Sequence, residues 1–206
     1  MSATIEEIRH SAAHLVASAV CSLFDDVKID IGPATDDGFY YDFDLPHRLS
    51  AEDFPAIEKA VRKLIGAKLP FVREEVSREE ARKIFKDQPY KLERLADIPE
   101  GEPISIYRTG DYVDLCRGPH VAHSGCVGAV KLMSVAGSYY RGDEHNKMLQ
   151  RVYGIAAASQ KEVDAIIARI EEAKKRDHRK LGKELELFTI TESVGPGLAH
   201  WLPKGA

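Results

Sequence analysis

Cysteine is scarce in this 206-residue sequence, which has only Cys21, Cys116 and Cys126. Three cysteines cannot form the even, paired framework that staples small secreted domains. We therefore expect reduced thiols and a cytoplasmic protein.

Long apolar runs are also missing. No uninterrupted stretch approaches the ~18 apolar residues that a membrane-spanning helix needs. The first residues include Glu6 and Glu7 rather than the basic segment that opens a secretory signal peptide. The sequence thus predicts a soluble protein that is not exported.

Neither sign of charge dominates, since 29 lysines and arginines face 33 aspartates and glutamates, for a net charge of −4. This balance gives no attraction for nucleic acid over the whole surface, so such a partner would have to meet a local basic patch. Hydrophobic residues make up 44% and charged residues 30%, which is ordinary for a globular protein.

Hydrophobic periodicity predicts an α+β fold. The spacing predicts a helix from Ile5 to about Phe24, capped by Thr4, and a β-hairpin from Val27 to Asp44. The other expected elements are a helix capped by Ser50 that ends before Pro70, a strand at Phe71–Val76, a short helix capped by Ser77 that runs through Phe85, strands at Ile104–Arg108, Tyr112–Leu115, Val127–Leu132 and Met148–Ala157, and a helix from Lys161 to about Leu185. We expect the histidine-bearing N-terminal helix and further helices to pack on a mainly antiparallel sheet, followed by a long C-terminal linker helix.

Two histidines, His10 and His14, lie four residues apart on the first expected helix. Positions i and i+4 share one face of a helix, so the two imidazoles can share a metal, share a proton or hold a water between them. A second pair at the same spacing, Cys116 and His120, is interrupted by a Gly-Pro dipeptide, which favours a turn after a strand.

Three interpretations of these four residues stay open from their spacing alone. In the first, all four bind zinc, either in a closed structural site or with one position left for water. In the second, they line a metal-free hydrolytic pocket in which an imidazole takes a proton from water. In the third, they are a buried thiol and histidines satisfied by ordinary packing.

Further candidates lie around the second pair. Asp114 is two residues before Cys116, so on a strand both side chains point to the same face, where a carboxylate could orient a histidine or bind a ribose hydroxyl. The alternative for Asp114 is a surface ion pair with a neighbouring arginine, worth ~0–1 kcal/mol. Lys91 could place a cation near a phosphate or a carbonyl, although the sequence alone favours an exposed lysine.

Two segments have the composition of nucleic-acid surfaces. Residues 137–154 mix aromatic residues with arginine and lysine, a pattern that a hairpin rim would share. On the expected C-terminal helix, six cations outnumber Asp177 and Glu184; they are Lys174, Lys175, Arg176, Arg179, Lys180 and Lys183. Either a solvated helix face or a contact with an RNA backbone accounts for this cluster.

Several longer motifs carry a family resemblance. They are Arg9-His10-Ser11-Ala12-Ala13-His14, Ile31-Gly32-Pro33, Gly38-Phe39-Tyr40-Tyr41-Asp42, Tyr112-Val113-Asp114-Leu115-Cys116-Arg117-Gly118-Pro119-His120, Lys131-Leu132-Met133, Ala136-Gly137, Tyr140-Arg141-Gly142-Asp143, Asn146-Lys147-Met148-Leu149-Gln150-Arg151 and Arg176-Asp177-His178-Arg179-Lys180-Leu181-Gly182. In this order, and over almost the whole chain, they resemble the editing (N2, second additional) domain of bacterial-type threonyl-tRNA synthetase.

What the resemblance implies is proofreading, the hydrolysis of the aminoacyl ester of mischarged seryl-tRNA(Thr). Serine is threonine without one methyl group, and a difference of that size supplies only ~1–3 kcal/mol of discrimination, so a second sieve is needed. The residues that the resemblance assigns to catalysis are His10, His14, Lys91, Asp114, Cys116 and His120. Tyr41, Arg117 and Arg141 are expected to bind the substrate. The cluster expected to bind tRNA is Lys174, Lys175, Arg176, Arg179 and Lys180. The expected partner is the 3′ acceptor end of tRNA(Thr) carrying serine, with no membrane partner.

The resemblance also bears on the metal. The related alanyl editing domains carry the same four residues as a zinc site, whereas the threonyl branch is taken to work without metal. We therefore expect no cofactor for editing, and a histidine is the first candidate for activating water. The alternative is zinc at His10, His14, Cys116 and His120 in a tRNA-binding module without independent catalysis.

The resemblance predicts three parts: an editing domain at 1–160, a linker helix at 161–183, and the truncated start of a class II synthetase catalytic domain at 184–206. ATP and the synthetic-site zinc belong to the missing catalytic domain, so this polypeptide alone is not expected to aminoacylate. A fragment is the simplest explanation, and a natural freestanding deacylase is the alternative. We expect a monomer, because the parent family dimerises largely through its catalytic domain. Activity could also require the missing domains.

Overall fold

The computed structural model describes residues 3–176, 178–190 and 199–205, with only the backbone described at 178–180 and 190. The chain divides into two compact units, Met1–Val163 and Asp164–Ala206, and each is described by itself. Among the described residues, no helix has the length and apolar character to cross a membrane.

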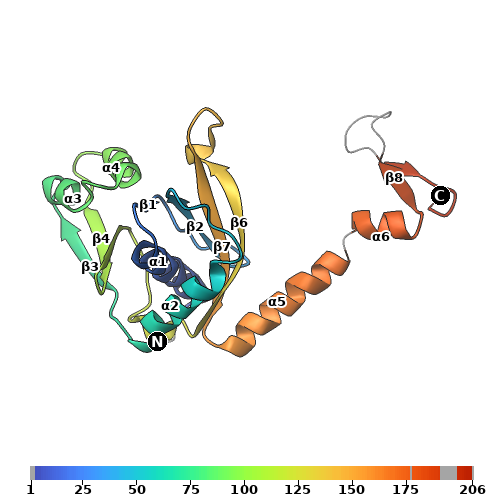
Figure 1. Ribbon diagram of the computed structural model, residues 1–206, viewed down its shortest axis with the longest axis horizontal. Helices are drawn as coiled ribbons and strands as arrows, with labels where there is room; N and C mark the ends of the chain where they lie inside the picture. Colours follow the sequence, from blue (N-terminus) through green and yellow to red (C-terminus); the bar gives the residue numbers. More distant parts are fainter. Residues whose placement is uncertain (1–2, 177, 191–198, 206) are drawn as a thin grey trace. The chain divides into compact units, whose positions relative to one another are not determined.

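The first unit is built around helix α1 (Ile5–Leu23) (Figure 1). A capping box opens it: the Thr4 hydroxyl accepts the Glu7 N–H at 3.2 Å, and the Glu7 carboxylate accepts the Thr4 N–H at 2.7 Å. Small and branched apolar residues such as Ala12, Leu15 and Val16 are completely buried along it. The predicted helix and its cap are therefore confirmed.

A four-stranded antiparallel sheet lies beside this helix, in the order β1 (Lys28–Ile29), β2 (Phe39–Asp44), β7 (Met148–Ala157) and β6 (Ala129–Tyr139). Helix α1 contacts β2 and β7, and α2 (Phe54–Gly66) contacts β6, so both helices cover one face of the sheet (Figure 1). The predicted hairpin is confirmed, and so are the strands predicted at Val127–Leu132 and Met148–Ala157. Strand β6 extends beyond its predicted end at Leu132 to Tyr139.

A second, three-stranded sheet has the order β3 (Val72–Val76), β4 (Ile104–Thr109) and β5 (Tyr112–Leu115), again antiparallel. Helices α3 (Arg78–Ile84) and α4 (Pro89–Ala96) pack on it through a separate small core. The predicted Ser77 cap of α3 is confirmed. Helix α4 was not predicted, because its eight residues are too short for a clear period and begin with proline.

The start of α2 differs from the prediction. The Asp53 carboxylate accepts the N–H of Ser50 at 2.8 Å, and this bond closes a turn before the helix. The helix itself begins at Phe54, with Pro55 in its first turn and no side-chain cap. Ser50 as the helix cap was therefore wrong, because the serine belongs to the preceding turn. The α+β class and the antiparallel sheets are confirmed.

The loop between β5 and β6 carries His120 and contains the short helix η1 (Ser124–Cys126). Its Gly118 has φ of +78°, and a Cβ there would lie 2.3 Å from the Tyr107 hydroxyl, so only glycine fits. The predicted turn after the strand is confirmed. Strands β6 and β7 are joined through η2 (Tyr140–Gly142).

The second unit contains most of α5 (Gln160–Lys175), α6 (His178–Glu184) and an antiparallel pair, β8 (Phe188–Ile190) and β9 (Ala199–Trp201). One helix from Lys161 to about Leu185 was predicted. The structure describes two helices on either side of residue 177, which lies outside the described residues. The three-part division at 160 and 183 stays a prediction.

Candidate active site

Helix α1 and the loop after β5 bring the two predicted pairs together. The Sγ atom of Cys116 lies 3.3 Å from Nε2 of His10 and 3.3 Å from Nε2 of His120. The ring of His14 is 4.2 Å from the ring of His120, centre to centre. Residues more than a hundred positions apart in sequence thus form one cluster, which we call the imidazole–thiol cluster: His10, His14, Cys116 and His120.

A second polar group lies behind this cluster and is centred on Asp114, which is 1% exposed. One carboxylate oxygen accepts the hydroxyls of Tyr41 at 2.5 Å and Tyr112 at 2.9 Å, and the other pairs with the Lys91 ammonium. The first oxygen also lies 3.4 Å from Nε2 of His14, which joins the two groups. We call Asp114, Lys91, Tyr41 and Tyr112 the carboxylate network.

Burial leaves the imidazole–thiol cluster uncharged around neutral pH. Loss of water lowers the pKa of His10, His14 and His120, because a buried imidazolium has no solvent to stabilise it. Burial also raises the pKa of the Cys116 thiol to about 12, and the charge of Asp114 acts in the same direction. The cluster therefore holds neutral imidazoles and a protonated thiol.

The ring of His120 is held on several sides. Phe71 stacks on it with ring centres 5.0 Å apart, and Tyr107 meets it edge-on at 4.4 Å. Its Nδ1 lies 3.0 Å from the Ser11 hydroxyl. The ring of His10 is fixed in its turn by a 3.1 Å bond between its Nδ1 and the carbonyl of Pro119.

The cluster has the composition and closeness of a zinc site. One ligand atom from each of the four residues lies within 4.8 Å of all the others. Tetrahedral zinc, with bonds of about 2.0–2.3 Å to nitrogen and sulfur, sets its ligand atoms roughly 3.3–3.7 Å apart. Nδ1 of His14 is buried and has no hydrogen-bond partner among the described residues. The residues therefore fit zinc, with His14 supplying its unpartnered nitrogen.

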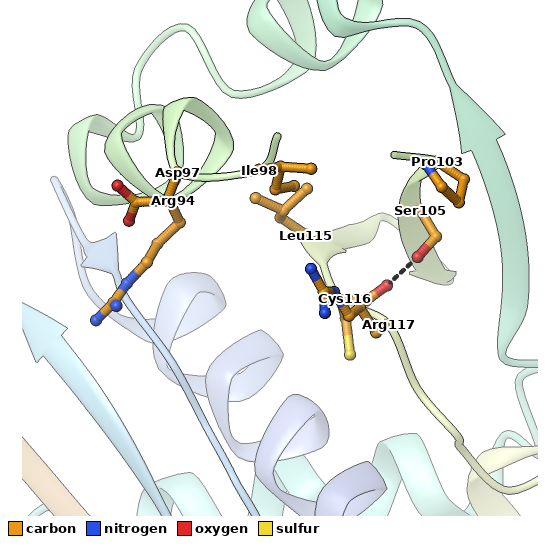
Figure 2. Close-up of a pocket in the computed structure, with 8 residues that line it drawn as sticks. All are labelled: Arg94, Asp97, Ile98, Pro103, Ser105, Leu115, Cys116 and Arg117. Carbon is orange, nitrogen blue, oxygen red and sulfur yellow. Dashed lines mark hydrogen bonds between the residues drawn. The ribbon is translucent and has the colours of Figure 1, made fainter. Parts of the chain in front are cut away.

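A cleft of about 280 Å³ opens beside Cys116 (Figure 2). Its walls come from α4 and the following turn, the start of β4 and the end of β5, and its lining residues are Arg94, Asp97, Ile98, Pro103, Ser105, Leu115, Cys116 and Arg117. Figure 2 shows the Cys116 sulfur pointing away from Ile98 and Pro103, while the Cys116 carbonyl accepts the Ser105 hydroxyl at 2.7 Å. The thiol thus turns to the histidines, and its backbone borders the cleft.

The predicted catalytic residues all lie in the cluster or the network. Lys91 is 3% exposed, so the exposed lysine favoured by the sequence alone was wrong: its charge is buried against Asp114. The surface ion pair considered for Asp114 is wrong for the same reason. Tyr41 is completely buried, and its assignment to substrate binding stays a prediction.

The remaining predicted residues lie outside the cluster. Arg117 is exposed at the cleft and pairs with Glu102 at 3.1 Å. Arg141, in η2, pairs with the cleft residue Asp97 at 2.6 Å. Lys174 and Lys175 end α5 and Arg176 follows them, all three in exposed positions of the second unit, whereas the side chains of Arg179 and Lys180 lie outside the described residues. Their roles stay predictions.

Tyr112 and Ser11 make hydrogen bonds in the site and were not predicted as site residues. Tyr112 lies two positions before Asp114 on β5, so the period of a strand could have placed its hydroxyl on the same face. Ser11 lies between His10 and His14, but its partner is a histidine 109 positions later, which no local pattern reveals.

Known proteins that are similar to this chain include aminoacyl-tRNA synthetases. Residues 104–153 match the family described as threonyl and alanyl tRNA synthetase second additional domain. The chain is 56% identical over 202 residues to a threonine–tRNA ligase of Dehalococcoides mccartyi, an alignment that covers 98% of this chain and 34% of that protein. It is 52% identical over 208 residues to the threonine–tRNA ligase of Geobacillus kaustophilus, covering 100% of this chain and 32% of that protein.

The chain thus spans about a third of the length of the curated relatives it matches. The resemblance noted from the sequence motifs is confirmed by the family match within this chain and by the identity along nearly all of it. Over nearly all of its length the chain is thus similar to one part of the threonine–tRNA ligases, which is consistent with the editing domain of threonyl-tRNA synthetase.

Proposed function

We propose that this chain hydrolyses the ester bond of seryl-tRNA(Thr) and leaves threonyl-tRNA(Thr) intact. The observation that carries the proposal is the imidazole–thiol cluster, in which neutral imidazoles meet a thiol beside a cleft. The relatives are named as threonine–tRNA ligases, which supports tRNA(Thr) as the proposed substrate class. The proposed reaction is cytoplasmic, like protein synthesis itself.

His10 is the proposed base. Its Nδ1–H donates to the Pro119 carbonyl, so the neutral ring presents a lone pair on Nε2. In the proposed reaction this nitrogen takes a proton from water while the water oxygen attacks the ester carbonyl. The bond between the carbonyl carbon and the ribose oxygen then breaks, and the imidazolium gives the proton to that oxygen, which leaves as a ribose hydroxyl. The products are serine and uncharged tRNA.

The carboxylate network supports this reaction through position and charge. Asp114 and Lys91 neutralise each other, so the buried site gains no net charge from them. Two tyrosine hydroxyls and the ammonium hold the Asp114 carboxylate in one orientation, and the carboxylate lies against His14. The proposed task of the network is to hold in place the side chains that border the bound serine.

The acceptor end of the RNA is proposed to approach along the cleft beside Cys116. Arg117 is exposed there, and its side chain can leave Glu102 for a phosphate at little cost, because an exposed ion pair is worth only ~0–1 kcal/mol. The exposed cations at the end of α5 are proposed to contact the tRNA backbone.

The deciding experiment incubates the purified chain with seryl- and threonyl-tRNA(Thr) and follows amino-acid release. Faster release of serine is expected, with little release from His10→Ala or Cys116→Ala proteins that keep their folded spectra. Equal release of both amino acids, or none at any tRNA concentration, would contradict the proposal. If release appears only when the chain is joined to the rest of a relative, the site is an editing site that needs the other domains.

Zinc is the second candidate, favoured by the unpartnered Nδ1 of His14 and the close approach of the four donors. His10, His14, Cys116 and His120 would hold it. A bound zinc stabilises the fold and, with an open position, lowers the pKa of a bound water. Elemental analysis of the purified chain separates the cases: stoichiometric zinc with tRNA binding and no release of serine identifies a zinc-stabilised binding module.

A further inference from the structure

Ser11 links helix α1 to the loop that carries His120. Its side chain has no exposed surface. The Oγ atom lies 3.0 Å from Nδ1 of His120 and 3.0 Å from the backbone nitrogen of Val121. A single buried hydroxyl therefore contacts two successive residues of the loop.

The direction of these two bonds follows from which groups can donate. A backbone N–H only donates, so Ser11 Oγ accepts from Val121. The hydroxyl proton then needs an acceptor of its own, and among the described residues the one within reach is Nδ1 of His120. That nitrogen must carry a lone pair, so the neutral ring of His120 holds its proton on Nε2.

His10 is the opposite neutral tautomer. The Pro119 carbonyl can only accept, so His10 holds its proton on Nδ1 and presents a lone pair on Nε2. Both Nε2 atoms face the same sulfur at 3.3 Å. The thiol of Cys116 accepts from His120 and donates to His10, and every proton in this chain of bonds has one acceptor.

We propose that Ser11 is a positioning residue that fixes His120 as the hydrogen-bond donor of the site, opposite His10 as the acceptor. This inference rests on the proposed hydrolysis. A thiol is a weak acceptor, so an ester carbonyl oxygen that enters beside Cys116 takes over the bond from His120 Nε2–H. Negative charge that develops on this oxygen during attack is then stabilised by a donor already in place.

The first test uses the free wild-type protein and needs no substrate. Nitrogen-15 NMR of labelled histidines distinguishes the two neutral tautomers of each ring. The expected result is a proton on Nε2 of His120 and on Nδ1 of His10. A proton on Nδ1 of His120 would overturn the inference, whatever the protein hydrolyses.

The second test compares three variants in the release of serine from seryl-tRNA(Thr). Ser11→Ala should lose the single tautomer of His120 and lower kcat roughly tenfold with KM nearly unchanged, the effect of one lost hydrogen bond in a buried site. Ser11→Thr keeps the hydroxyl and should restore both. Ser22→Ala is the matched control, since this serine on the same helix donates to the Ala19 carbonyl.

The outcomes separate this inference from the proposed function. If Ser11→Ala keeps the Nε2 tautomer and the wild-type kcat, the role of Ser11 is refuted. If the wild-type tautomers are as expected but no protein releases serine, the hydrogen-bond assignment stands and the hydrolytic function is refuted.

Discussion

The imidazole–thiol cluster and the carboxylate network adjoin each other and are both largely buried, yet one contains neutral side chains and the other contains charged ones. The network keeps its charges and satisfies them mutually, with Asp114 bound by Lys91 and two tyrosines. The cluster gives up charge and orders its protons by hydrogen bonds to the Pro119 carbonyl and Ser11.

The difference separates two kinds of task. Separating a buried charge from its partner costs much free energy, so the network is suited to keep the neighbouring side chains in fixed positions. Neutral groups with defined donors and acceptors can pass a proton without moving net charge through the interior, so the cluster is suited to chemistry. Each group can be disrupted by substitution while the other is observed.

The largest effect is expected on activity, from His10→Ala. Loss of the base should slow release of serine by about 10²–10⁴-fold, the usual contribution of a general base, while the network and the fold persist. Single-turnover deacylation measures it. His47→Ala is the control, because His47 is a half-exposed histidine paired with Asp53. A His10→Ala protein that keeps a tenth of the wild-type rate would contradict the assigned role.

On the network side, Asp114→Asn should destabilise the fold by about 3–5 kcal/mol, because it leaves the Lys91 ammonium buried without its partner. Urea unfolding followed by circular dichroism measures this loss. The double variant Asp114→Asn with Lys91→Met removes both charges and should recover most of it. If both proteins unfold at the same urea concentration, the buried ion pair does not account for the loss.

The neutral cluster should make stability depend on pH. The folded pKa values of His14 and His120 are lowered, so the unfolded chain binds protons first as pH falls below about 6.5. Stability is then full above this pH and declines below it by up to about 1.4 kcal/mol per pH unit for each histidine. Denaturant unfolding between pH 7.5 and pH 5 measures how much the free energy of unfolding changes per pH unit. His120→Gln should make this change smaller by the contribution of one histidine. An unchanged slope in that variant would show that His120 is not the group involved.

The smallest effect concerns one hydroxyl of the network. Tyr112→Phe removes a hydrogen bond to Asp114 while Tyr41 and Lys91 keep the carboxylate satisfied, so a loss of about 1 kcal/mol is expected. Tyr139→Phe, at an exposed position on β6, is the control and should leave the unfolding midpoint unchanged. A loss above about 3 kcal/mol would mean that the network depends on Tyr112 more than its geometry indicates.

The local elements could be predicted from the sequence because their signals are local. Thr4 and Ser77 cap helices through residues three positions away, and β7 follows its expected bounds. The short helix α4 could not be predicted from local signals. Ser50 was wrongly predicted to cap a helix, because a serine side chain also stabilises turns.

The candidate site was predictable as two pairs but not as one cluster. The spacing of residues in the sequence does not predict that His10 contacts Cys116, since the two residues are 106 positions apart. The burial of Lys91 likewise depends on Asp114 on another element, so the sequence alone favoured solvent. The family resemblance supplied the assignments that the local pattern left open.

The long separation between the two halves of the cluster has a consequence for synthesis of the chain. A ribosome adds about 5–20 residues per second, so α1 is made roughly 5–20 s before Cys116 follows it. During that interval the buried face of α1, including Leu15 and Val16, has neither the β2–β7 sheet complete nor its loop partners. The pocket therefore cannot assemble step by step along the nascent chain, and it forms only when nearly the whole first unit is available to fold.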